Sequence, residues 1–255
     1  MRLDEIEFRE ITRNETMEIL LNYHYLQRMP PVSVAFGAFH LDELIGVITY
    51  GKPPSNSLCK GVAGEQLSQN VYELNRLYTL DETPDNLESK FISYTLKQLK
   101  KRNWLIISYA DEAMGHSGYV YQATNWLYTG KTASRTDIYV SESGHSRHYS
   151  ANQQSFVIRK VRSAKHRYLY ICGDKTFKKE VFEKLNYPII DEYPKGGVQH
   201  YEVGDTTKSI LYHKGTKKMF TEEEFLSDPS NYLSEDELAY YKKHYLPKNE
   251  QVTLF

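Results

Sequence analysis

The clearest pattern of hydrophobic and polar positions in this 255-residue chain lies between residues 71 and 130. Apolar side chains from Phe91 to Leu99 recur at helical spacing with lysines between them, and this period predicts an amphipathic helix. Either Thr83 or Asp85 is expected to cap the free amides of its first turn. Because the helix connects two apolar segments, we expect a strand-helix-strand unit here.

The apolar segment 104–110 follows this helix and is typical of a central strand that is covered on both faces. Ser108 lies near its carboxyl end and Asp111 comes directly after it. In open α/β sheets ligands bind beyond the carboxyl ends of the strands. Ser108 and Asp111 are therefore candidate site residues, and capping of the next helix is the structural alternative for Asp111.

A second helix is expected after the Gly-His-Ser-Gly turn at residues 115–118, and Gly130 is expected to end it. On such a helix Tyr121, Asn125 and Tyr128 would share one arc and face a common cleft. A half-buried polar rim is the alternative, and with 22 tyrosines in the chain no single one decides between the two.

The rest of the chain alternates between strand-like and helix-like periods, which indicates an α/β fold. The expected strands are 5–12, a hairpin of 33–40 and 43–51 that turns at Leu41-Asp42, 71–80, 154–161 and 167–172; the further helices are 14–27 and 175–186; and 57–69 is a loop. Residues 209–220 suggest a short hairpin and 221–246 an acidic helical extension. A boundary is therefore expected after residue 208, between a domain at 1–208 and an extension at 209–255.

Composition and cysteine usage indicate a soluble protein of a reducing cytoplasm. The mean hydropathy is −0.61. Cys59 and Cys172 lie far apart without metal-ligand spacing, so no disulfide framework is expected. The chain is charged from Arg2 onward, and no apolar run approaches the roughly 20 residues of a membrane span. We expect neither export nor membrane anchoring.

The formal net charge of −1 argues against a nucleic-acid partner for the chain as a whole. The acids are concentrated after residue 220, however, and basic runs occur at 97–102 and 159–167. Such runs can follow phosphates or form an ordinary solvated face. Glu73 and Arg76 interrupt an apolar strand, so we expect them to line a cleft or pair with each other. The residues expected to contact nucleic acid are Arg76, Arg159, Lys160, Arg162, Lys165, Arg167 and Lys195.

Histidines add further candidate chemistry. His24 lies beside Tyr25, just before a Met-Pro-Pro segment that must end its helix, and could be a base, a ligand or a surface residue. His145 and His148 form a His-x-x-His pair. No helix holds this pair and no third ligand is obvious, so phosphate contact or simple solvation is favoured over metal binding.

The last five residues, Gln251–Phe255, end in Leu-Phe, which is unusual for a tail with nothing to bury such side chains. Gln followed after two residues by Leu-Phe resembles the short peptide by which bacterial proteins dock on the replicative sliding clamp. The clamp is therefore a candidate partner, and packing back onto the domain is the alternative.

The order of elements resembles the acetyltransferase fold of the GNAT superfamily, which implies a mixed central sheet flanked by helices. The segment from Ala123 to Gly130 is similar to that superfamily's Ala-x-x-x-Leu-Tyr-x-x-Gly ending. Where the superfamily has a glycine-rich loop that binds the pyrophosphate of coenzyme A, residues 81–89 contain no glycine and four acids. Use of acetyl-coenzyme A is therefore not expected.

A closer resemblance is to the Mom-type DNA modification proteins of bacteriophages, over about residues 20–200. The matching segments are His24-Tyr25-Leu26, Val47–Gly51, Glu73–Leu77, Pro84–Asn86, Glu88–Phe91, Ser108–Asp111 and Gly115–Asn125. The resemblance implies conversion of adenine in duplex DNA to an N6-carbamoylmethyl derivative, which shields phage DNA from restriction in the cytoplasm of the infected host. An iron requirement has been suggested for the family, and the donor of the added group stays open.

These expectations assign roles to the candidate residues. The exocyclic amine of adenine is a poor nucleophile, so a base such as Asp111 is useful, and the adenine must be turned out of the duplex and held. The expected catalytic residues are Asp111, Tyr121, Tyr25, His24, Ser108 and His116, and the expected donor-binding residues are Asn86, Ser89, Asn125 and Tyr128. An N-acyltransferase of a small amine or protein, and a non-catalytic module associated with DNA or the clamp, are the alternative functions.

Overall fold

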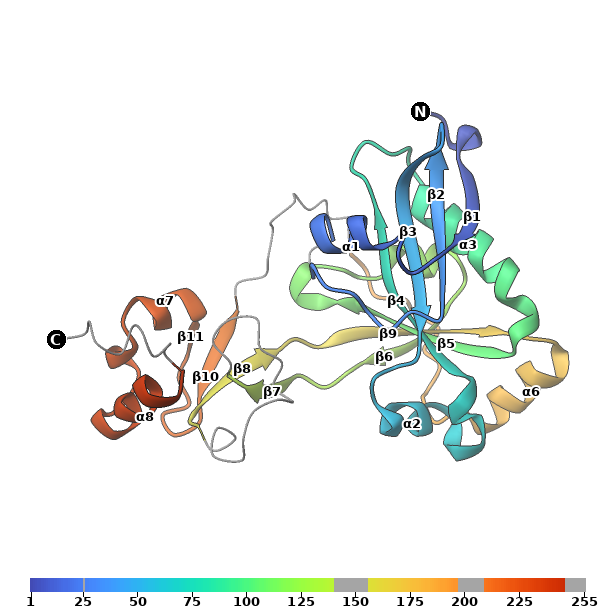
Figure 1. Ribbon diagram of the computed structural model, residues 1–255. Coiled ribbons are helices and arrows are strands. Elements are labelled where there is room, and N and C mark those ends of the chain that lie inside the picture. The colour runs from blue at the N-terminus through green and yellow to red at the C-terminus, as the bar shows by residue number, and fades with distance from the viewer. Residues whose placement is uncertain (25, 140–155, 197–208, 246–255) are drawn as a thin grey trace. The chain divides into compact units, whose positions relative to one another are not determined.

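The computed structural model describes residues 1–24, 26–139, 156–196 and 209–245 (Figure 1). The chain divides into two compact units, Met1–Thr132 with Lys165–Asp205 and Ala133–Ala164 with Thr206–Phe255. This division differs from a single boundary after residue 208. Residues 133–164 belong to the second unit because the strand 158–162 pairs with a strand that begins at Ile210, and the strand 135–138 pairs with 158–162 in turn.

The first unit contains a sheet with the strand order β1-β2-β3-β4-β5-β9-β6. Its strands are β1 (Glu7–Ile11), β2 (Val34–His40), β3 (Glu43–Gly51), β4 (Val71–Thr79), β5 (Trp104–Asp111), β6 (Leu127–Lys131) and β9 (Lys165–Cys172). β4 and β5 pair in parallel, whereas the other neighbouring strands in this sheet are antiparallel. The expected α/β fold with a mixed sheet and flanking helices is confirmed.

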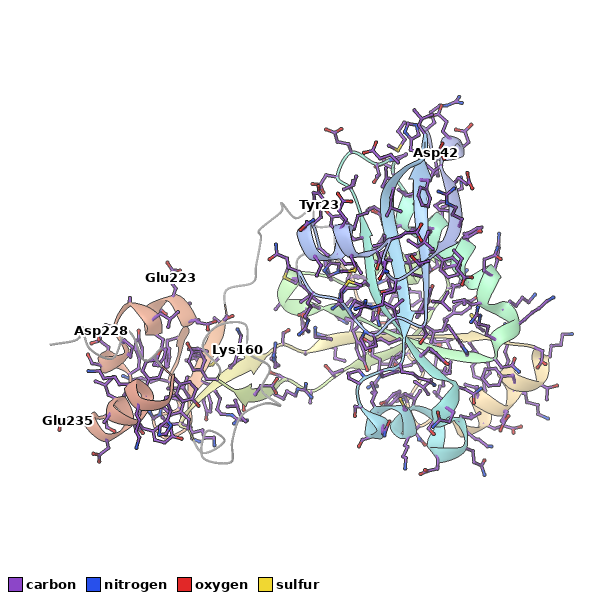
Figure 2. All side chains as sticks on the ribbon, viewed as in Figure 1. Tyr23, Asp42, Lys160, Glu223, Asp228 and Glu235 are labelled. Carbon is purple, nitrogen blue, oxygen red and sulfur yellow. The ribbon has the colours of Figure 1, made fainter. Side chains whose placement is uncertain are left out.

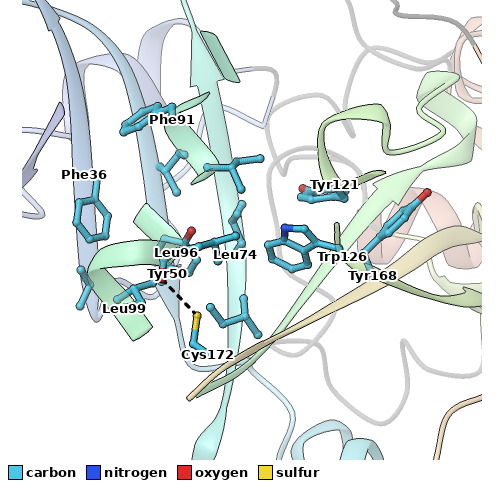
Figure 3. Close-up of a cluster of buried hydrophobic side chains, with 14 of the residues drawn as sticks. Phe36, Tyr50, Leu74, Phe91, Leu96, Leu99, Tyr121, Trp126, Tyr168 and Cys172 are labelled. Carbon is cyan, nitrogen blue, oxygen red and sulfur yellow. Dashed lines mark hydrogen bonds between the residues drawn. The ribbon is translucent and has the colours of Figure 1, made fainter. Parts of the chain in front are cut away.

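Helices cover both faces of this sheet (Figure 1). They are α1 (Met17–Asn22), α2 (Asn56–Leu67), α3 (Leu87–Leu99), α4 (Tyr119–Ala123) and α6 (Lys175–Lys184). The face under α3 and α4 buries one continuous core that includes Phe36, Phe91 and Trp126 (Figure 3). On the opposite face, α1 covers one core and α2 with α6 covers another. Apolar side chains that alternate along each strand supply both faces.

The β2–β3 hairpin turns at Leu41-Asp42, as expected. Both residues adopt left-handed backbone conformations, with φ of 49° and 66°, which is the geometry of a two-residue type I′ turn. Asp42 lies exposed at the tip of the hairpin (Figure 2).

Two helix starts differ from the sequence predictions. Residues 57–69, expected to be a loop, mostly form α2, because Ser55 caps the helix by accepting a hydrogen bond from the Leu58 amide. α3 begins after Asn86, which has φ 65° and makes no side-chain capping bond, so the predicted capping by Thr83 or Asp85 was wrong.

Three of the predicted helices are longer than the observed ones. α1 ends at Asn22 and leaves Met17 and Leu21 more than a third exposed. α4 ends at Ala123, because Asn125 adopts φ 59° and the chain then enters β6, so no helix reaches Gly130. α6 ends at Lys184 rather than at residue 186.

The second unit contains a sheet with the strand order β11-β10-β8-β7. Its elements are β7 (Arg135–Ile138), β8 (Ile158–Arg162), β10 (Ile210–His213), β11 (Met219–Thr221), α7 (Glu222–Ser227) and α8 (Glu235–Tyr245). Aromatic side chains such as Tyr139, Phe156, Phe225 and Tyr241 dominate its buried core. The predicted 209–220 hairpin is confirmed. The acidic segment after it contains two helices that pack on this core.

In the described parts of the chain, every helix is too short or too polar to span a bilayer.

Candidate functional site

The parallel strands β4 and β5 stop pairing in the middle of the sheet. Their last paired residues are Glu73 and Ile107. One residue further on, the Ser108 hydroxyl lies 2.9 Å from the carbonyl oxygen of Leu74 and 2.8 Å from the hydroxyl of Tyr121. A side chain therefore replaces the ladder bond that the Leu74 carbonyl loses where the two strands part.

Alternation along β5 sorts the candidate residues between the two faces of the sheet. β5 pairs with β9 in an unbroken register, so successive side chains point to opposite faces. Ile106 and Ser108 point toward α3 and α4, whereas Ile107 belongs to the core on the other side. Asp111 is an even number of residues from Ile107, so its side chain lies on the same face as Ile107 and opposite Ser108. The predicted convergence of Asp111 with Tyr121 is therefore not what the structure shows.

On the α3 and α4 face, the hydroxyl groups form buried structural bonds. Tyr168 donates to the Ser117 carbonyl (2.5 Å), and burial raises the pKa of Tyr168 to about 12. The hydroxyl of Tyr128 bonds to Nδ1 of His166 (2.9 Å), and burial raises the pKa of Tyr128 as well. Tyr121 is buried among these rings, 5.2 Å from Tyr168 between ring centroids. Of these hydroxyl groups, those of Ser108 and Tyr121 lie where β4 and β5 part.

On the opposite face, Asp111 and Lys165 form an ion pair with Oδ2 and Nζ 2.6 Å apart. The other carboxylate oxygen of Asp111 accepts a hydrogen bond from the Ala113 amide (3.1 Å). His116 lies close to both charges. Its pKa is lowered chiefly by burial, Asp111 opposes that shift, and Lys165 adds to it. Asp111 thus serves both as a cap and as the centre of a charged group.

Glu73 belongs to the same charged group. Burial raises the pKa of its carboxyl group, and the positive charges of Arg76 and Lys165 partly offset that rise. Arg76 also acts on His24, whose side chain is 4% exposed. Burial, reinforced by Arg76, lowers the pKa of His24 to about 3, so its ring is neutral near pH 7.

We call His24, Glu73, Arg76, Asp111, His116 and Lys165 the charged cluster. It unites three of the predicted catalytic residues with two that were expected to contact nucleic acid. From its charge inside an apolar strand, Glu73 was expected to line a cleft or pair with Arg76, but it was not assigned a catalytic role. Tyr109 was also missed. Burial and the nearby Glu73 charge raise its pKa.

The predicted donor-binding residues do not come together. The Ser89 hydroxyl donates to the Asn86 carbonyl (3.0 Å) at the start of α3. Asn125 is exposed beyond the end of α4, and Tyr128 is buried in β6. In the first turn of α3, Glu88 accepts a hydrogen bond from Thr79 (2.7 Å), which fixes a carboxylate where a pyrophosphate would bind. This helix start does not suit coenzyme A.

The basic residues divide between the two units. Arg159, Lys160 and Arg162 lie in β8 of the second unit, where Lys160 pairs with Glu222 and Arg162 with Asp137. In the first unit, the Arg167 guanidinium donates hydrogen bonds to the hydroxyl and the carbonyl oxygen of Thr129. Its central carbon lies 3.4 Å from the centroid of the Tyr187 ring. Lys195 is exposed.

The described residues contain no group of three or more His, Cys, Asp or Glu side chains that could hold a metal ion. They therefore do not fit the iron that the family resemblance suggested, and the proposed mechanism uses no metal. Tyr25, His145, His148 and Gln251–Phe255 lie outside the described residues.

Together the fold and the site define an α/β protein in which the parallel strands β4 and β5 separate beside a cluster of titratable and basic side chains. The model of the Mom protein family matches residues 5–195. The chain therefore belongs to the Mom protein family.

The sequence is similar to the methylcarbamoylase mom of Escherichia phage Mu, with 34% identity over 121 residues, which cover 46% of this chain and 50% of that protein. The chain thus spans about half the length of this curated relative.

Similar solved structures include a Bacillus subtilis acetyltransferase in complex with CoA (16% identity, TM-score 0.37, 66% of this chain and 97% of the other). Another is the ribosomal-protein-S5-alanine acetyltransferase of Vibrio fischeri (10% identity, TM-score 0.41, 68% and 96%). No residue role is taken from these similarities.

Proposed function

We propose that this chain is a transferase that adds a carbamoylmethyl group to the exocyclic amine of adenine in phage DNA and so protects that DNA from restriction. Membership of the Mom family supports the proposal, as does the name of the phage Mu relative. The structural observation that carries it is the charged cluster at the point where β4 and β5 separate.

The reaction needs a proton acceptor. A bond forms between adenine N6 and the incoming methylene carbon, the bond from that carbon to the donor's leaving group breaks, and N6 loses one proton. Glu73 is the best-placed acceptor, because a buried carboxylate with a raised pKa is a stronger base than an ordinary one. Asp111 is already paired with Lys165, so this proposal assigns the acceptor role to Glu73.

Asp111 has a second task in this proposal. It pairs with Lys165, whose positive charge also acts on Glu73 and His116. Lys165 and Arg76 then favour a negatively charged partner near the cluster, such as the phosphates that flank an extruded adenine. On the other face, Ser108 links β5 to the Leu74 carbonyl of β4 and to Tyr121, and in this proposal neither side chain touches the reactants.

The donor in this proposal carries the carbamoylmethyl group on a leaving group other than coenzyme A. The carboxylate in the first turn of α3 opposes a pyrophosphate there. The rival N-acyltransferase function predicts tight coenzyme A binding, so titration of the purified protein with coenzyme A separates the two.

The direct test is to express the protein in bacteria, digest the host DNA to nucleosides and search by mass spectrometry for adenosine that carries the added group. Arg76→Gln should lose the product, whereas the exposed Arg13→Gln should keep it. Unmodified adenosine despite soluble protein and retained DNA binding would contradict the transferase and favour a non-catalytic DNA module.

A further inference from the structure

A pocket lies at the other end of β5 from the charged cluster. It is lined by the second half of α3, the end of α4, the end of β9 and the first half of α6, and its volume is about 350 Å³. Cys172, in its wall, pairs with Trp104, whereas Lys165 pairs with Asp111. Seven residues of strand separate these two positions, which is roughly 23 Å.

Positive charge dominates the lining of this pocket. Lys97, Lys100 and Lys178 contribute to its wall, and no Asp or Glu does so among the described residues. The nearest acid along the chain, Asp174, points its carboxylate at the start of α6, where it accepts a hydrogen bond from the Phe177 amide (2.8 Å). We call this site the lysine pocket.

The lysine pocket also offers neutral hydrogen-bond donors. Ser93 and Asn125 line it, and within the described part of the chain neither side chain is used in another hydrogen bond. Within the same described residues, Lys97, Lys100 and Lys178 form no ion pair. Three lysines contribute to the wall of one hollow, and their charges would attract an anion bound there.

Cys172 does not supply a nucleophile here. Its thiol is 2% exposed and lies 3.8 Å from the Leu96 carbonyl. Burial raises its pKa to about 12, so the thiol stays protonated. The pocket therefore has the features of a binding site and lacks those of a catalytic one.

We propose that the lysine pocket binds a small phosphorylated molecule at a site separate from the charged cluster. A volume of about 350 Å³ is within the usual range for small-ligand sites. Donors that surround a hollow suit a compact phosphate group better than the outer surface of a duplex. The inference does not depend on adenine modification.

The test uses the full chain with pyrophosphate and ADP as probes, titrated by calorimetry. The double variant Lys97→Gln/Lys178→Gln should weaken binding more than about tenfold, because it removes two charged donors. The charge-matched control Lys101→Gln/Lys179→Gln changes exposed lysines outside the pocket and should alter the affinity less than twofold. Circular dichroism checks that both variants fold.

Three results would overturn the proposal. The first is absence of saturable binding of either probe at millimolar concentration. The second is equal weakening in the pocket and control variants, which would indicate general surface charge. The third is weaker binding of duplex DNA in the pocket variant while neither probe binds, which would make these lysines contacts for DNA phosphates.

Discussion

Ser108 and Leu74 are joined by a hydrogen bond of 2.9 Å between a side-chain hydroxyl and a main-chain carbonyl, one residue beyond the last paired position of β4 and β5. Ser108 is 1% exposed and also contacts the hydroxyl of Tyr121. One serine thus provides a bonding partner to two buried polar groups where the sheet opens. Its hydroxyl bridges β4 and β5 one residue beyond their last ladder position.

The substitution Ser108→Ala should therefore lower the free energy of unfolding by about 1–3 kcal/mol, because a buried carbonyl and a buried phenol lose a partner. Ser57→Ala, on the exposed side of α2, should change it by less than about 0.5 kcal/mol. Urea denaturation followed by circular dichroism measures both. Equal effects of the two substitutions would show that Ser108 does not support the opening.

Glu73→Gln should separate activity from stability. If Glu73 accepts the N6 proton, formation of modified adenosine should fall about 10²–10⁴-fold. Stability should not fall at pH 7, because a buried carboxyl group with a raised pKa is destabilising when ionised and Gln removes that charge. The exposed Glu43→Gln is the matched control.

The pH dependence gives an independent check on Glu73. The pKa of Glu73 is raised in the folded protein. Stability contributed by the protonated carboxyl group is therefore lost as the pH increases from the ordinary pKa of a glutamate toward the folded-state pKa of Glu73. Activity should follow the opposite course and rise over the same interval. A Glu73→Gln protein with wild-type amounts of modified adenosine would exclude this residue as the base.

His24 should make the protein acid-sensitive. Its pKa is near 3 in the folded protein, against an ordinary value of 6.5, so stability is complete above pH 6.5 and is lost as pH falls toward 3. At pH 5 the loss due to this one residue is about 2 kcal/mol. His24→Asn should remove that part of the pH dependence, and His40→Asn should not. Unfolding midpoints at pH 7.5 and pH 5 compare the three proteins.

Much of the fold could be predicted from the sequence because periodicity reports which side chains are buried. The amphipathic helix around Phe91 and the apolar strand that ends at Asp111 stand where they were expected. The extent of the helix after Gly118 could not be predicted, since the left-handed turn at Asn125 depends on local backbone conformation. β7 and β8 join the second unit because β8 pairs with β10, a strand far away in sequence, and local patterns do not report such pairing.

The structure brings some of the candidate residues together and separates others, and the role of each stays a prediction. His24, Asp111 and His116 do belong to one charged cluster. Tyr121 was expected beside Asp111, but the alternation of β5 sends Ser108, which bonds to Tyr121, and Asp111 to opposite faces. Which face a strand residue occupies depends on register and on the covering helices, and the sequence alone did not specify either.

Asp111→Asn should abolish the modification without unfolding the protein. The variant breaks the ion pair with Lys165, whose side chain is 41% exposed, so the change in unfolding free energy should stay within about 1 kcal/mol. Asp42→Asn at the β2–β3 turn is a suitable control, because Asn also tolerates the left-handed conformation of that position (Figure 2). Retained activity in Asp111→Asn would remove this carboxylate from the mechanism.

The second unit allows a test in which neighbouring residues serve as variant and control. In α7, Phe225 is 0% exposed and contacts Tyr139 and Tyr241, whereas Leu226 is 53% exposed. Phe225→Ala should cost about 3–5 kcal/mol, because it opens a cavity in an aromatic core, and Leu226→Ala should cost far less. Hydrogen exchange of the β10 and β11 amides in the full chain measures the effect. Similar exchange rates in the two variants would show that α7 does not stabilise this sheet.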